Sequence, residues 1–312
     1  MPDQTINHYQ NLMADPVRMN AYHEAIRRTC RGKIVCEVGV GLGPISLMAL
    51  KAGAERVYGI EMDGAALEVA IRVLRDNGYD ESRFIPIHGM SHRVDLPERV
   101  DVVLSEILNS VAFGENALFF LEDARRRFLK PDGRMVPQSL SCYAALTNPA
   151  TFQAERTFWK DDLQIDYGMD YSYMLNFLHH DNKVIALLPD EILTGWQRFS
   201  TTHFEDSKGY RQPKPVVFQL EKSCLPTGCC IAFDLTLTDG VRLSTLPGVR
   251  ATHWQQGFCA FPEPIFCEPG DAITLQIIIP RSEEPRTYIQ AHIQHIPAPL
   301  IRPPLSSAGA AG

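Results

Sequence analysis

Residues 33–63, KIVCEVGVGLGPISLMALKAGAERVYGIEMD, carry the strongest architectural signal of this chain. A short apolar run at 33–38 ends in the glycines of 39–43, a helix-like stretch follows at 44–52, and a second apolar run stands at 56–60. A buried strand, a glycine-rich turn, a helix and another strand in this order are typical of a parallel α/β unit. The segment therefore predicts a parallel sheet with a ligand-binding loop after its first strand.

The same alternation continues on both sides of this segment. Helical periodicity predicts helices at 5–29, 44–52, 65–77 and 117–129. Apolar runs predict further strands at 83–87 and 100–104. Pro16 is expected to divide the first helix, and KPDG at 130–133 predicts a turn. We therefore expect an N-terminal helical segment over 1–30 that covers the ligand, followed by a doubly wound, Rossmann-like α/β domain over 31–136.

The character of the chain changes after residue 136. Short alternating segments then recur between turn residues: SLSCYAAL, KPVVFQL, IAFDLTL, AITLQIIIP and TYIQAHIQHI. This pattern predicts an antiparallel β-barrel domain over 137–305. Aromatic-rich, partly helical sequence within it predicts an arm at about 160–190, and the low-complexity tail at 306–312 is expected to be disordered.

The composition limits the class of function. The chain has 312 residues, 45% of them hydrophobic, and a formal net charge of −7, which argues against binding nucleic acid because phosphate contacts need a basic surface. The start MPDQTINHYQ lacks the basic and apolar parts of a signal peptide, and the sequence contains no apolar run of about 20 residues that would span a membrane. We expect a cytoplasmic protein.

The eight cysteines predict neither disulfides nor a metal site. None forms a CxxC pair, and no histidine stands at ligand spacing beside the only dense group, Cys224, Cys229 and Cys230. Reduced structural cysteines are the expectation for a cytosolic protein.

The glycine loop and the acids around it suggest the kind of cofactor. Glycines let the backbone pass close to a ligand, and Glu61, at the end of the second strand, can accept hydrogen bonds from ribose hydroxyls. The spacing is GxGxG, and Glu37 precedes it, so we expect the acid to repel a pyrophosphate and to suit the amino end of S-adenosylmethionine. A nicotinamide dinucleotide remains an alternative. Arg18, on the first helical segment, is expected from sequence alone to be a solvated surface residue.

Two glutamates nine residues apart, Glu106 and Glu115, follow the strand at 100–104. Glycoside hydrolysis would use such a pair but has no place for a cofactor loop, and a metal site would need more ligands nearby. Two carboxylates can also hold a guanidinium and direct one nitrogen at a methyl donor. At ~5 Å and an effective dielectric of about 20, guanidinium and sulfonium repel each other by roughly 3 kcal/mol, and two nearby carboxylates offset this.

Four segments of the chain, in order, resemble the protein arginine methyltransferase family over nearly the whole length. Residues 35–63 are similar to its first two cofactor motifs, and LPERVDVVLSEI (96–107) followed by Glu115 is similar to its double-glutamate loop. THW at 252–254 resembles its late substrate-channel loop, and YGMD at 167–170 resembles part of its dimerisation arm.

The resemblance implies an S-adenosylmethionine-dependent arginine N-methyltransferase that forms a homodimer and uses no metal. The implied cofactor-binding residues are Tyr9, Arg18, Gly39, Gly41, Glu61, Ser91 and His92. The implied catalytic residues are Glu106, Glu115, His253 and Asp15, the last two as a hydrogen-bonded pair. Trp254 and Thr252 would line the substrate channel, although a core histidine beside Trp254 would be the expectation for His253 without the resemblance.

Departures from the family pattern bear on the product and the acceptor. Residues 107–110, ILNS, replace the Trp-Met-Gly-Tyr that often follows the first loop glutamate, and GENAL resembles the monomethylating branch. His92 stands where an acid is usual, and Tyr9 (or His8) stands in place of a cofactor-contacting histidine.

The short chain and the altered loop slightly favour free L-arginine as the acceptor, as in the bacterial enzyme of streptozotocin biosynthesis. Arg198 or Lys160 would then hold the carboxylate of the amino acid. The alternatives are a peptidyl arginine acceptor and an inactive, cofactor-binding dimeric scaffold.

Overall fold

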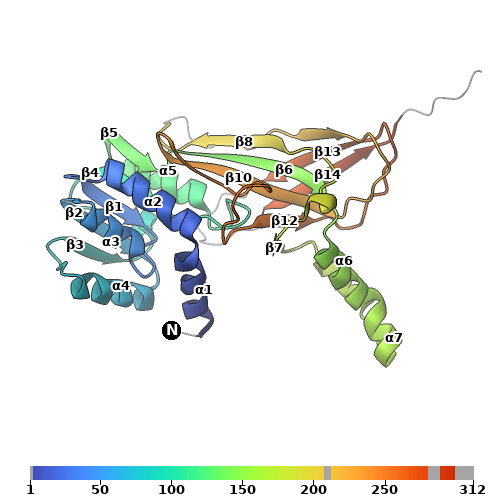
Figure 1. Cartoon of the computed structure of the whole chain (residues 1–312), viewed down its shortest axis with the longest axis horizontal. Helices are drawn as coiled ribbons and strands as arrows, with labels where there is room; N and C mark the ends of the chain where they lie inside the picture. Colours follow the sequence, from blue (N-terminus) through green and yellow to red (C-terminus); the bar gives the residue numbers. More distant parts are fainter. Residues whose placement is uncertain (1–2, 207–211, 280–288, 299–312) are drawn as a thin grey trace, which may run out of the picture.

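The computed structural model describes residues 3–206, 212–279 and 289–298. A parallel sheet with its helices lies at one end, an antiparallel β domain lies beside it, and a helical arm projects from the β domain (Figure 1). Buried apolar side chains of both halves form one continuous core. Among the described helices, none combines the length and the apolar composition that a membrane span requires. The tail at 306–312 lies outside the described residues.

The parallel sheet confirms the predicted Rossmann-like fold. Its strands are β1 (Ile34–Val38), β2 (Arg56–Glu61), β3 (Phe84–His88), β4 (Val100–Ser105) and β5 (Leu129–Val136). They lie in the order β3-β2-β1-β4-β5, and every neighbouring pair is parallel. The connections contain α3 (Pro44–Lys51), α4 (Gly64–Asp76), the short 3-10 turn η1 (Ser91–Arg93) and α5 (Ala117–Phe128). The order reverses between β1 and β4, and ligands of such sheets bind at the carboxyl ends of the strands there.

The turn predicted at 130–133 is wrong, because these residues lie inside β5. Leu129 is paired with Val100, but Arg134 is paired with Val102, so the ladder between β4 and β5 shifts register across the KPDG sequence. Proline and glycine mark strand irregularities as well as turns, and the sequence alone does not distinguish the two.

Two helices precede the sheet, as predicted: α1 (Asp3–Ala14) and α2 (Pro16–Thr29). Asp15, between them, caps α2, since its Oδ1 accepts hydrogen bonds from Val17 N at 2.9 Å and Arg18 N at 3.0 Å. Pro16 occupies the first helical position, where no backbone N–H is needed. α2 packs against α3 and against β11 (Val241–Ser244) of the other half, so it bridges the two halves (Figure 1).

The second half is antiparallel, as predicted, and its described strands pair in two sheets. One contains β6 (Ser139–Thr147), β7 (Asn182–Ile185), β8 (Gln197–His203), β10 (Gly228–Thr238), β11 (Val241–Ser244) and β12 (Gln256–Ala260). The other contains β9 (Val216–Gln219), β13 (Ala272–Ile278) and β14 (Gln290–Ile296). The sequence did not predict β7, β8, β11 and β12.

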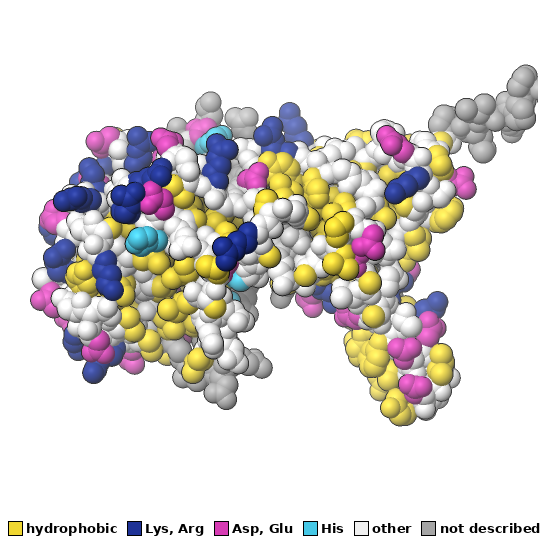
Figure 2. All heavy atoms as spheres, in the orientation of Figure 1, with side chains coloured by type: hydrophobic (Ala, Val, Ile, Leu, Met, Phe, Trp, Pro, Cys, Tyr) yellow, Lys and Arg dark blue, Asp and Glu magenta, His cyan; other side chains and the backbone are white. Residues whose placement is uncertain are grey.

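The arm begins earlier and ends earlier than expected from the sequence. It consists of α6 (Ala150–Thr157), a π-helical turn η2 (Phe158–Asp162), α7 (Leu163–Tyr167) and the 3-10 helix η3 (Ser172–Phe177). The second part of the predicted range returns to the sheet, because β7 pairs with β12, and the short η4 (Pro189–Glu191) follows β7. The arm stands out from the body and carries hydrophobic side chains on its surface (Figure 2).

Candidate active site

Two of the predicted site residues follow neighbouring parallel strands. Val38, the last residue of β1, is in register with Ser105, the last residue of β4, so Gly39 and Glu106 leave the same edge of the sheet. The Ser105 hydroxyl donates to Val38 O at 2.8 Å, and the hydroxyl of Tyr22 on α2 donates to Ser105 O at 3.0 Å. The predicted cofactor loop and the first predicted acid therefore meet where the strand order reverses.

The glycine loop is closely packed. Gly39 and Gly41 have φ values of 82° and 55°, in the left-handed region. A Cβ on Gly39 would lie 2.6 Å from Ile107 Cγ2, and one on Gly41 would lie 2.9 Å from Tyr9 Cε1, so glycine is required at both positions. Gly41 N donates to Glu61 Oε2 at 2.8 Å. The loop thus lies between the acid at the end of β2 and a ring from α1.

Glu61 and Tyr9 form one side of this loop. Glu61 is buried, and its Oε1 accepts a hydrogen bond from Asp63 N at 2.9 Å. A carboxylate has about four acceptor positions, so lone pairs remain for the hydroxyls of a ligand. Burial, followed by the charges of Glu61, Asp63 and Glu115, raises the pKa of Tyr9 to about 12. Because His8 is exposed, Tyr9 is the residue that contacts the loop.

Arg18 is buried, with 4% of its surface exposed, and not solvated as its helix position alone predicted. Its Nε donates to Glu106 Oε2 at 2.9 Å, and its Nη2 contacts the same oxygen. Its Nη1 donates to Leu12 O at 3.2 Å. Burial raises the pKa of Glu106, and the charge of Arg18 opposes that rise. The residue predicted to hold the cofactor therefore binds the acid predicted to hold the acceptor.

The second predicted acid has a different environment. Glu115 is exposed, whereas the Glu106 side chain is only 5% exposed. The loop between them is shaped by Asn109, whose Oδ1 accepts hydrogen bonds from Val111 N at 3.2 Å and Gly114 N at 3.0 Å. A Cβ on Gly114 would lie 1.8 Å from Asn109 Nδ2, so the pair fits only with glycine. The convergence of both acids on one guanidinium stays a prediction.

Asp15 and His253 form the predicted hydrogen-bonded pair. Asp15 Oδ2 lies 2.9 Å from His253 Nδ1 and also accepts from His253 N at 2.9 Å. Burial alone would raise the pKa of Asp15, but hydrogen bonds from Arg18 N and His253 lower it. Burial lowers the pKa of His253, although the hydrogen bond with Asp15 acts to raise it. Since a carboxylate only accepts, Nδ1 carries the proton, and Nε2 of the neutral ring is an acceptor.

Trp254 is buried and supports the loop, and its predicted place in the wall of the substrate channel stays a prediction. It is 2% exposed, its ring packs 5.5 Å from that of Phe233, and its Nε1 donates to Leu108 O at 2.9 Å. On the adjacent strand, a Cβ on Gly257 would lie 2.3 Å from Val111 Cγ1. The β domain therefore fixes the position of the loop that carries both acids. Thr252 is also buried, and its Oγ1 has no hydrogen-bond partner among the described residues.

Ser91 and His92 lie in η1, after β3. The Ser91 hydroxyl is buried and has no hydrogen-bond partner within the described ranges. Its backbone oxygen accepts from Arg127 Nη1 at 3.0 Å, and the His92 ring lies 5.5 Å from Phe119 and 5.6 Å from Phe120 of α5. Both residues are thus fixed by α5, and their contact with an adenine stays a prediction.

Glu37 does not present a charge at the entrance of the loop, so the sequence argument against a pyrophosphate is wrong. The residue is 1% exposed, and its Oε2 accepts a hydrogen bond from the Ser46 hydroxyl. Burial raises the pKa of Glu37 from 4.5 to about 8, which keeps the carboxyl largely protonated at neutral pH. The choice of cofactor must therefore rest on other observations.

The shifted pKa of Glu37 predicts a pH-dependent stability. Between pH 4.5 and about 8 the unfolded chain loses this proton and the folded chain keeps it, so stability falls as pH rises, by up to about 1.4 kcal/mol per pH unit. Glu37→Gln should remove this contribution. Melting temperatures of both proteins across this range should show the wild type losing stability relative to the variant, and a constant difference would contradict the assignment.

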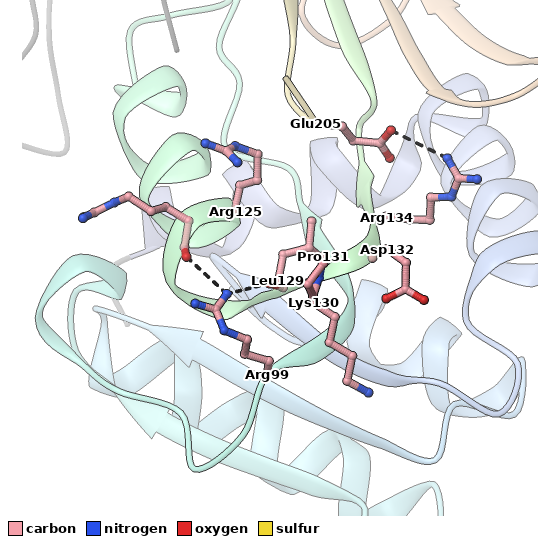
Figure 3. Close-up of a pocket in the computed structure, with 10 residues that line it drawn as sticks. Arg99, Arg125, Leu129, Lys130, Pro131, Asp132, Arg134 and Glu205 are labelled. Carbon is pink, nitrogen blue, oxygen red and sulfur yellow. Dashed lines mark hydrogen bonds and ion pairs between the residues drawn. The ribbon is translucent and has the colours of Figure 1, made fainter. Parts of the chain in front are cut away.

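A cavity of about 730 Å³ near the register shift of β5 contains none of the predicted site residues. Its lining is largely basic, and Arg99 and Arg134 face it (Figure 3). Arg99 Nη1 donates to the backbone oxygens of Arg126 at 3.2 Å and Leu129 at 2.7 Å, which caps the end of α5. Arg134 lies 3.7 Å from Glu205. These contacts are structural, and the cavity is separate from the candidate site.

Comparison with protein families matches both halves of the chain. A family described as ribosomal protein L11 methyltransferase matches residues 19–137. The arginine methyltransferase oligomerization subdomain matches residues 138–294, which is half of the chain.

Similar proteins of known sequence are arginine methyltransferases by name. A probable histone-arginine methyltransferase CARM1 of Oryza sativa subsp. indica is 29% identical over 286 residues, which cover 86% of this chain and 53% of the relative. Protein arginine N-methyltransferase 6 of Xenopus tropicalis is 27% identical, with 88% and 84% of the two chains covered. The chain spans about half the length of the first curated relatives it matches.

Solved structures support the fold. The Trypanosoma brucei PRMT1 enzyme-prozyme complex with AdoHcy matches with a TM-score of 0.75 at 22% identity, over 92% of this chain and 96% of the other. Arabidopsis thaliana protein arginine methyltransferase 10 matches with a TM-score of 0.72 at 22% identity, over 93% and 97%. Both pair a parallel-sheet domain with an antiparallel domain in one chain, as here.

Proposed function

We propose a function from one premise: the chain belongs to the protein arginine methyltransferase family. It transfers a methyl group from S-adenosylmethionine to the guanidinium of an arginine in a protein or peptide. The contact between Arg18 and Glu106 carries this proposal. Glu106 is a buried acid at the edge of the sheet where the strand order reverses, and it already binds the guanidinium of Arg18.

The residues around the glycine loop fit S-adenosylmethionine. This cofactor supplies an electrophilic methyl group on a sulfonium. Gly39 and Gly41 allow the turn after β1 to pack tightly against Ile107 and Tyr9, and Glu61 retains acceptor positions for ribose hydroxyls. The unpartnered Ser91 hydroxyl can bind the base. Arg18 can turn its planar donors to the cofactor carboxylate, and this exchange would release Glu106 for the acceptor.

Glu106 and Glu115 then hold the acceptor guanidinium. Both contacts from Arg18 go to Oε2 of Glu106, so Oε1 is available to a second guanidinium. Glu115 approaches from the exposed side, where a side chain of a protein substrate can enter. Together the two charges offset the roughly 3 kcal/mol of repulsion expected between guanidinium and sulfonium at ~5 Å.

Asp15 and His253 position the site and can receive a proton. Asp15 holds the Nδ1 proton, so Nε2 of the neutral imidazole is free to accept the proton that the guanidinium loses on methylation. The same carboxylate caps the helix that carries Arg18, so the pair also fixes α2.

Peptidyl arginine is better supported as the acceptor than free arginine, which the sequence slightly favoured. The relatives are named as histone- or protein-arginine methyltransferases. The two residues considered for binding the carboxylate of free arginine are both exposed, with Arg198 on β8 and Lys160 on the arm. Monomethylation and a cytoplasmic location stay predictions from the sequence.

The test is labelled S-adenosylmethionine with either an arginine-rich peptide or free L-arginine. We expect label in the peptide and little in free arginine. If only free arginine became labelled, the assignment of peptidyl arginine as the acceptor would be wrong. Cofactor binding without transfer to either would indicate the inactive scaffold, and nicotinamide binding in a thermal-shift assay would indicate an oxidoreductase.

We further propose that two copies pair through the arm. Ile165, Tyr167 and Tyr173 on the arm have 77%, 71% and 72% of their surfaces exposed, far more than isolated apolar side chains usually have. On the other half, α1 to α4 form an apolar cavity of about 340 Å³ that includes Met13, Met19 and Leu42. The arm of a second copy suits this cavity, and its binding would order the helices that carry Tyr9 and Arg18.

Negatively charged substitutions on the arm should therefore prevent dimer formation and lower the activity. We expect Ile165→Asp/Tyr173→Asp to sediment as a monomer and to lose activity by at least about tenfold, since aromatic anchors dominate such interfaces. Val217→Asp on β9, also exposed, should behave as the wild type. Analytical ultracentrifugation together with initial rates tests this, and a variant that remains dimeric would contradict the proposed interface.

A further inference from the structure

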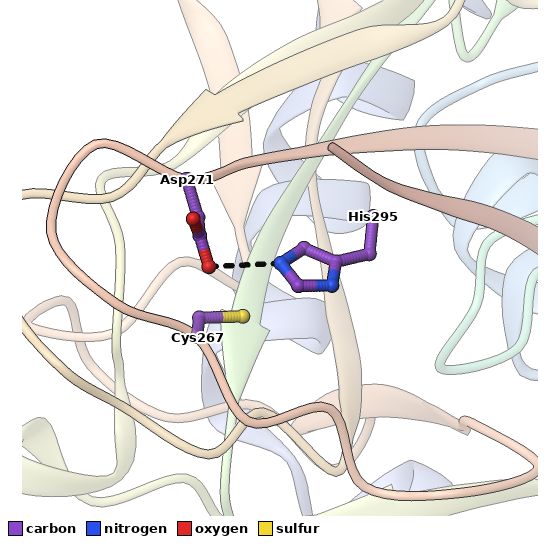
Figure 4. Close-up of side chains that lie close together, drawn as sticks. All are labelled: Cys267, Asp271 and His295. Atoms are coloured by element: carbon purple, nitrogen blue, oxygen red, sulfur yellow. Dashed lines mark hydrogen bonds and ion pairs between the residues drawn. The ribbon is translucent and has the colours of Figure 1, made fainter. Parts of the chain in front are cut away.

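Three potential metal ligands come together in the β domain, and none of them is among the residues of the candidate active site. The Sγ of Cys267 and one ligand atom each from Asp271 and His295 all lie within 4.8 Å of one another. Figure 4 shows their side chains turned toward a common point. Cys267 and Asp271 both precede β13, and Asp271 is directly next to its first residue. His295 lies on β14 and is paired with Ile273 of β13.

A fourth donor adjoins this cluster. Cys224 and Cys267 are paired across an isolated antiparallel bridge and exchange both backbone hydrogen bonds, at 3.1 and 3.0 Å. This bridge places the two cysteines opposite each other, and the Cys267 thiol contacts Ile265 O at 3.5 Å. Cys224 comes from the segment before β10, so the proposed donors come from three separate segments, which hold Cys224, Cys267 with Asp271, and His295.

The carboxylate is already held in place. Asp271 Oδ1 accepts from Ala298 N at 2.7 Å, and Oδ2 accepts from Glu268 N at 2.9 Å and lies 2.9 Å from His295 Nε2. These contacts fix the carboxylate beside the imidazole of His295, and carboxylate and imidazole are both ligands that zinc accepts.

The same cluster is unsuited to nucleophilic catalysis. Cys267 is 0% exposed, so a substrate cannot reach its sulfur. Two sulfurs, an imidazole nitrogen and a carboxylate oxygen are instead a ligand set that suits a tetrahedral zinc ion.

We propose that Cys224, Cys267, Asp271 and His295 form a binding site for Zn²⁺. The ion takes the place of the hydrogen between Asp271 and His295, whose proton moves from Nε2 to Nδ1 of the neutral ring, and each thiol releases its proton to solvent, so that two sulfur–zinc bonds form and no electrons are exchanged. Cys224 lies before β10 and His295 lies on β14, so the ion links the segment before β10 to the three-stranded sheet. This differs from the sequence-based expectation of no metal, which considered only ligands at short spacing.

The test uses the whole chain, reduced and stripped with a chelator, and then titrated with Zn²⁺ against a chromophoric competitor. We expect one tightly bound ion per chain. His295→Gln keeps a group that can hydrogen bond with Asp271 but is a poor zinc ligand, and it should weaken binding by at least about 10²-fold, the upper range seen for second-shell losses. His292→Gln, exposed on the same strand, is the matched control and should bind as the wild type.

Two further measurements keep the result independent of folding and of enzymatic activity. Zn²⁺ should raise the melting temperature of the wild type and of His292→Gln but not of His295→Gln. Co²⁺ should give the visible absorption of a tetrahedral thiolate site, and Cys224→Ser should change it. No zinc binding by the wild type, equal binding by His295→Gln, or a Cys224–Cys267 disulfide in the intact mass of the reduced protein would overturn the proposal.

Discussion

Replacing Glu106 by glutamine is expected to lower kcat/KM for methyl transfer to an arginine peptide by about 10²- to 10³-fold, the size seen when one preorganised electrostatic contact is removed. The variant loses one of the two charges that offset the repulsion between guanidinium and sulfonium. Glutamine can still accept a hydrogen bond from Arg18 but leaves that buried guanidinium without a counter-charge, so the rates are compared at a temperature where the variant is folded. Initial rates, with melting temperature and cofactor affinity as companion measurements, test this.

Glu98→Gln is the control for Glu106→Gln. Glu98 is a partly exposed acid whose Oε1 accepts a hydrogen bond from the Tyr58 hydroxyl at 2.8 Å, and it plays no part in the site. Its replacement should leave the rate unchanged. Activity of Glu106→Gln within a few-fold of the wild type, in a protein that melts normally, would contradict the role of Glu106 as a guanidinium ligand.

Replacing Arg18 by methionine should affect both stability and cofactor binding. The change leaves Glu106 buried without its guanidinium, which costs about 3–5 kcal/mol when a buried ion pair loses one partner. The double variant Arg18→Met/Glu106→Gln removes both charges and should melt above the single variant. Arg18→Met should also bind S-adenosylmethionine weakly, because no planar donor remains for its carboxylate.

Arg27→Met provides the comparison for Arg18→Met. Arg27 lies on the same helix, is 61% exposed and pairs with Glu24, so its loss should leave the melting temperature nearly unchanged. Thermal melts and isothermal titration with the cofactor measure both effects. If the double variant is no more stable than Arg18→Met, or if Arg18→Met binds the cofactor as the wild type does, then the two assigned roles of Arg18 are wrong.

Local sequence patterns were enough to predict most of the parallel half. Strand and helix periodicity, with the glycines of 39–43, placed β1 to β4 and α1 to α5 close to their observed bounds. These elements depend on contacts within short segments, which a sequence displays directly. The KPDG stretch failed because a strand irregularity and a turn use the same residues.

Features that depend on distant segments could not be predicted in the same way. Arg18 looks solvated on its own helix, and only the docking of α2 onto the end of β4 buries it against Glu106. Trp254 lies in the core because its indole N–H reaches Leu108 O, 146 residues away. The four proposed zinc ligands come from segments that the sheets of the β domain bring together.

The central claim is that Glu106 and Glu115 together hold an arginine guanidinium for methyl transfer. Glu115→Gln tests it most directly, since Glu115 is exposed and its replacement should alter neither melting temperature nor cofactor affinity. Mass spectrometry of an arginine peptide after incubation with S-adenosylmethionine should find methylated arginine with the wild type and a rate lower by about 10²-fold with Glu115→Gln. Equal rates for the two proteins would contradict the claim.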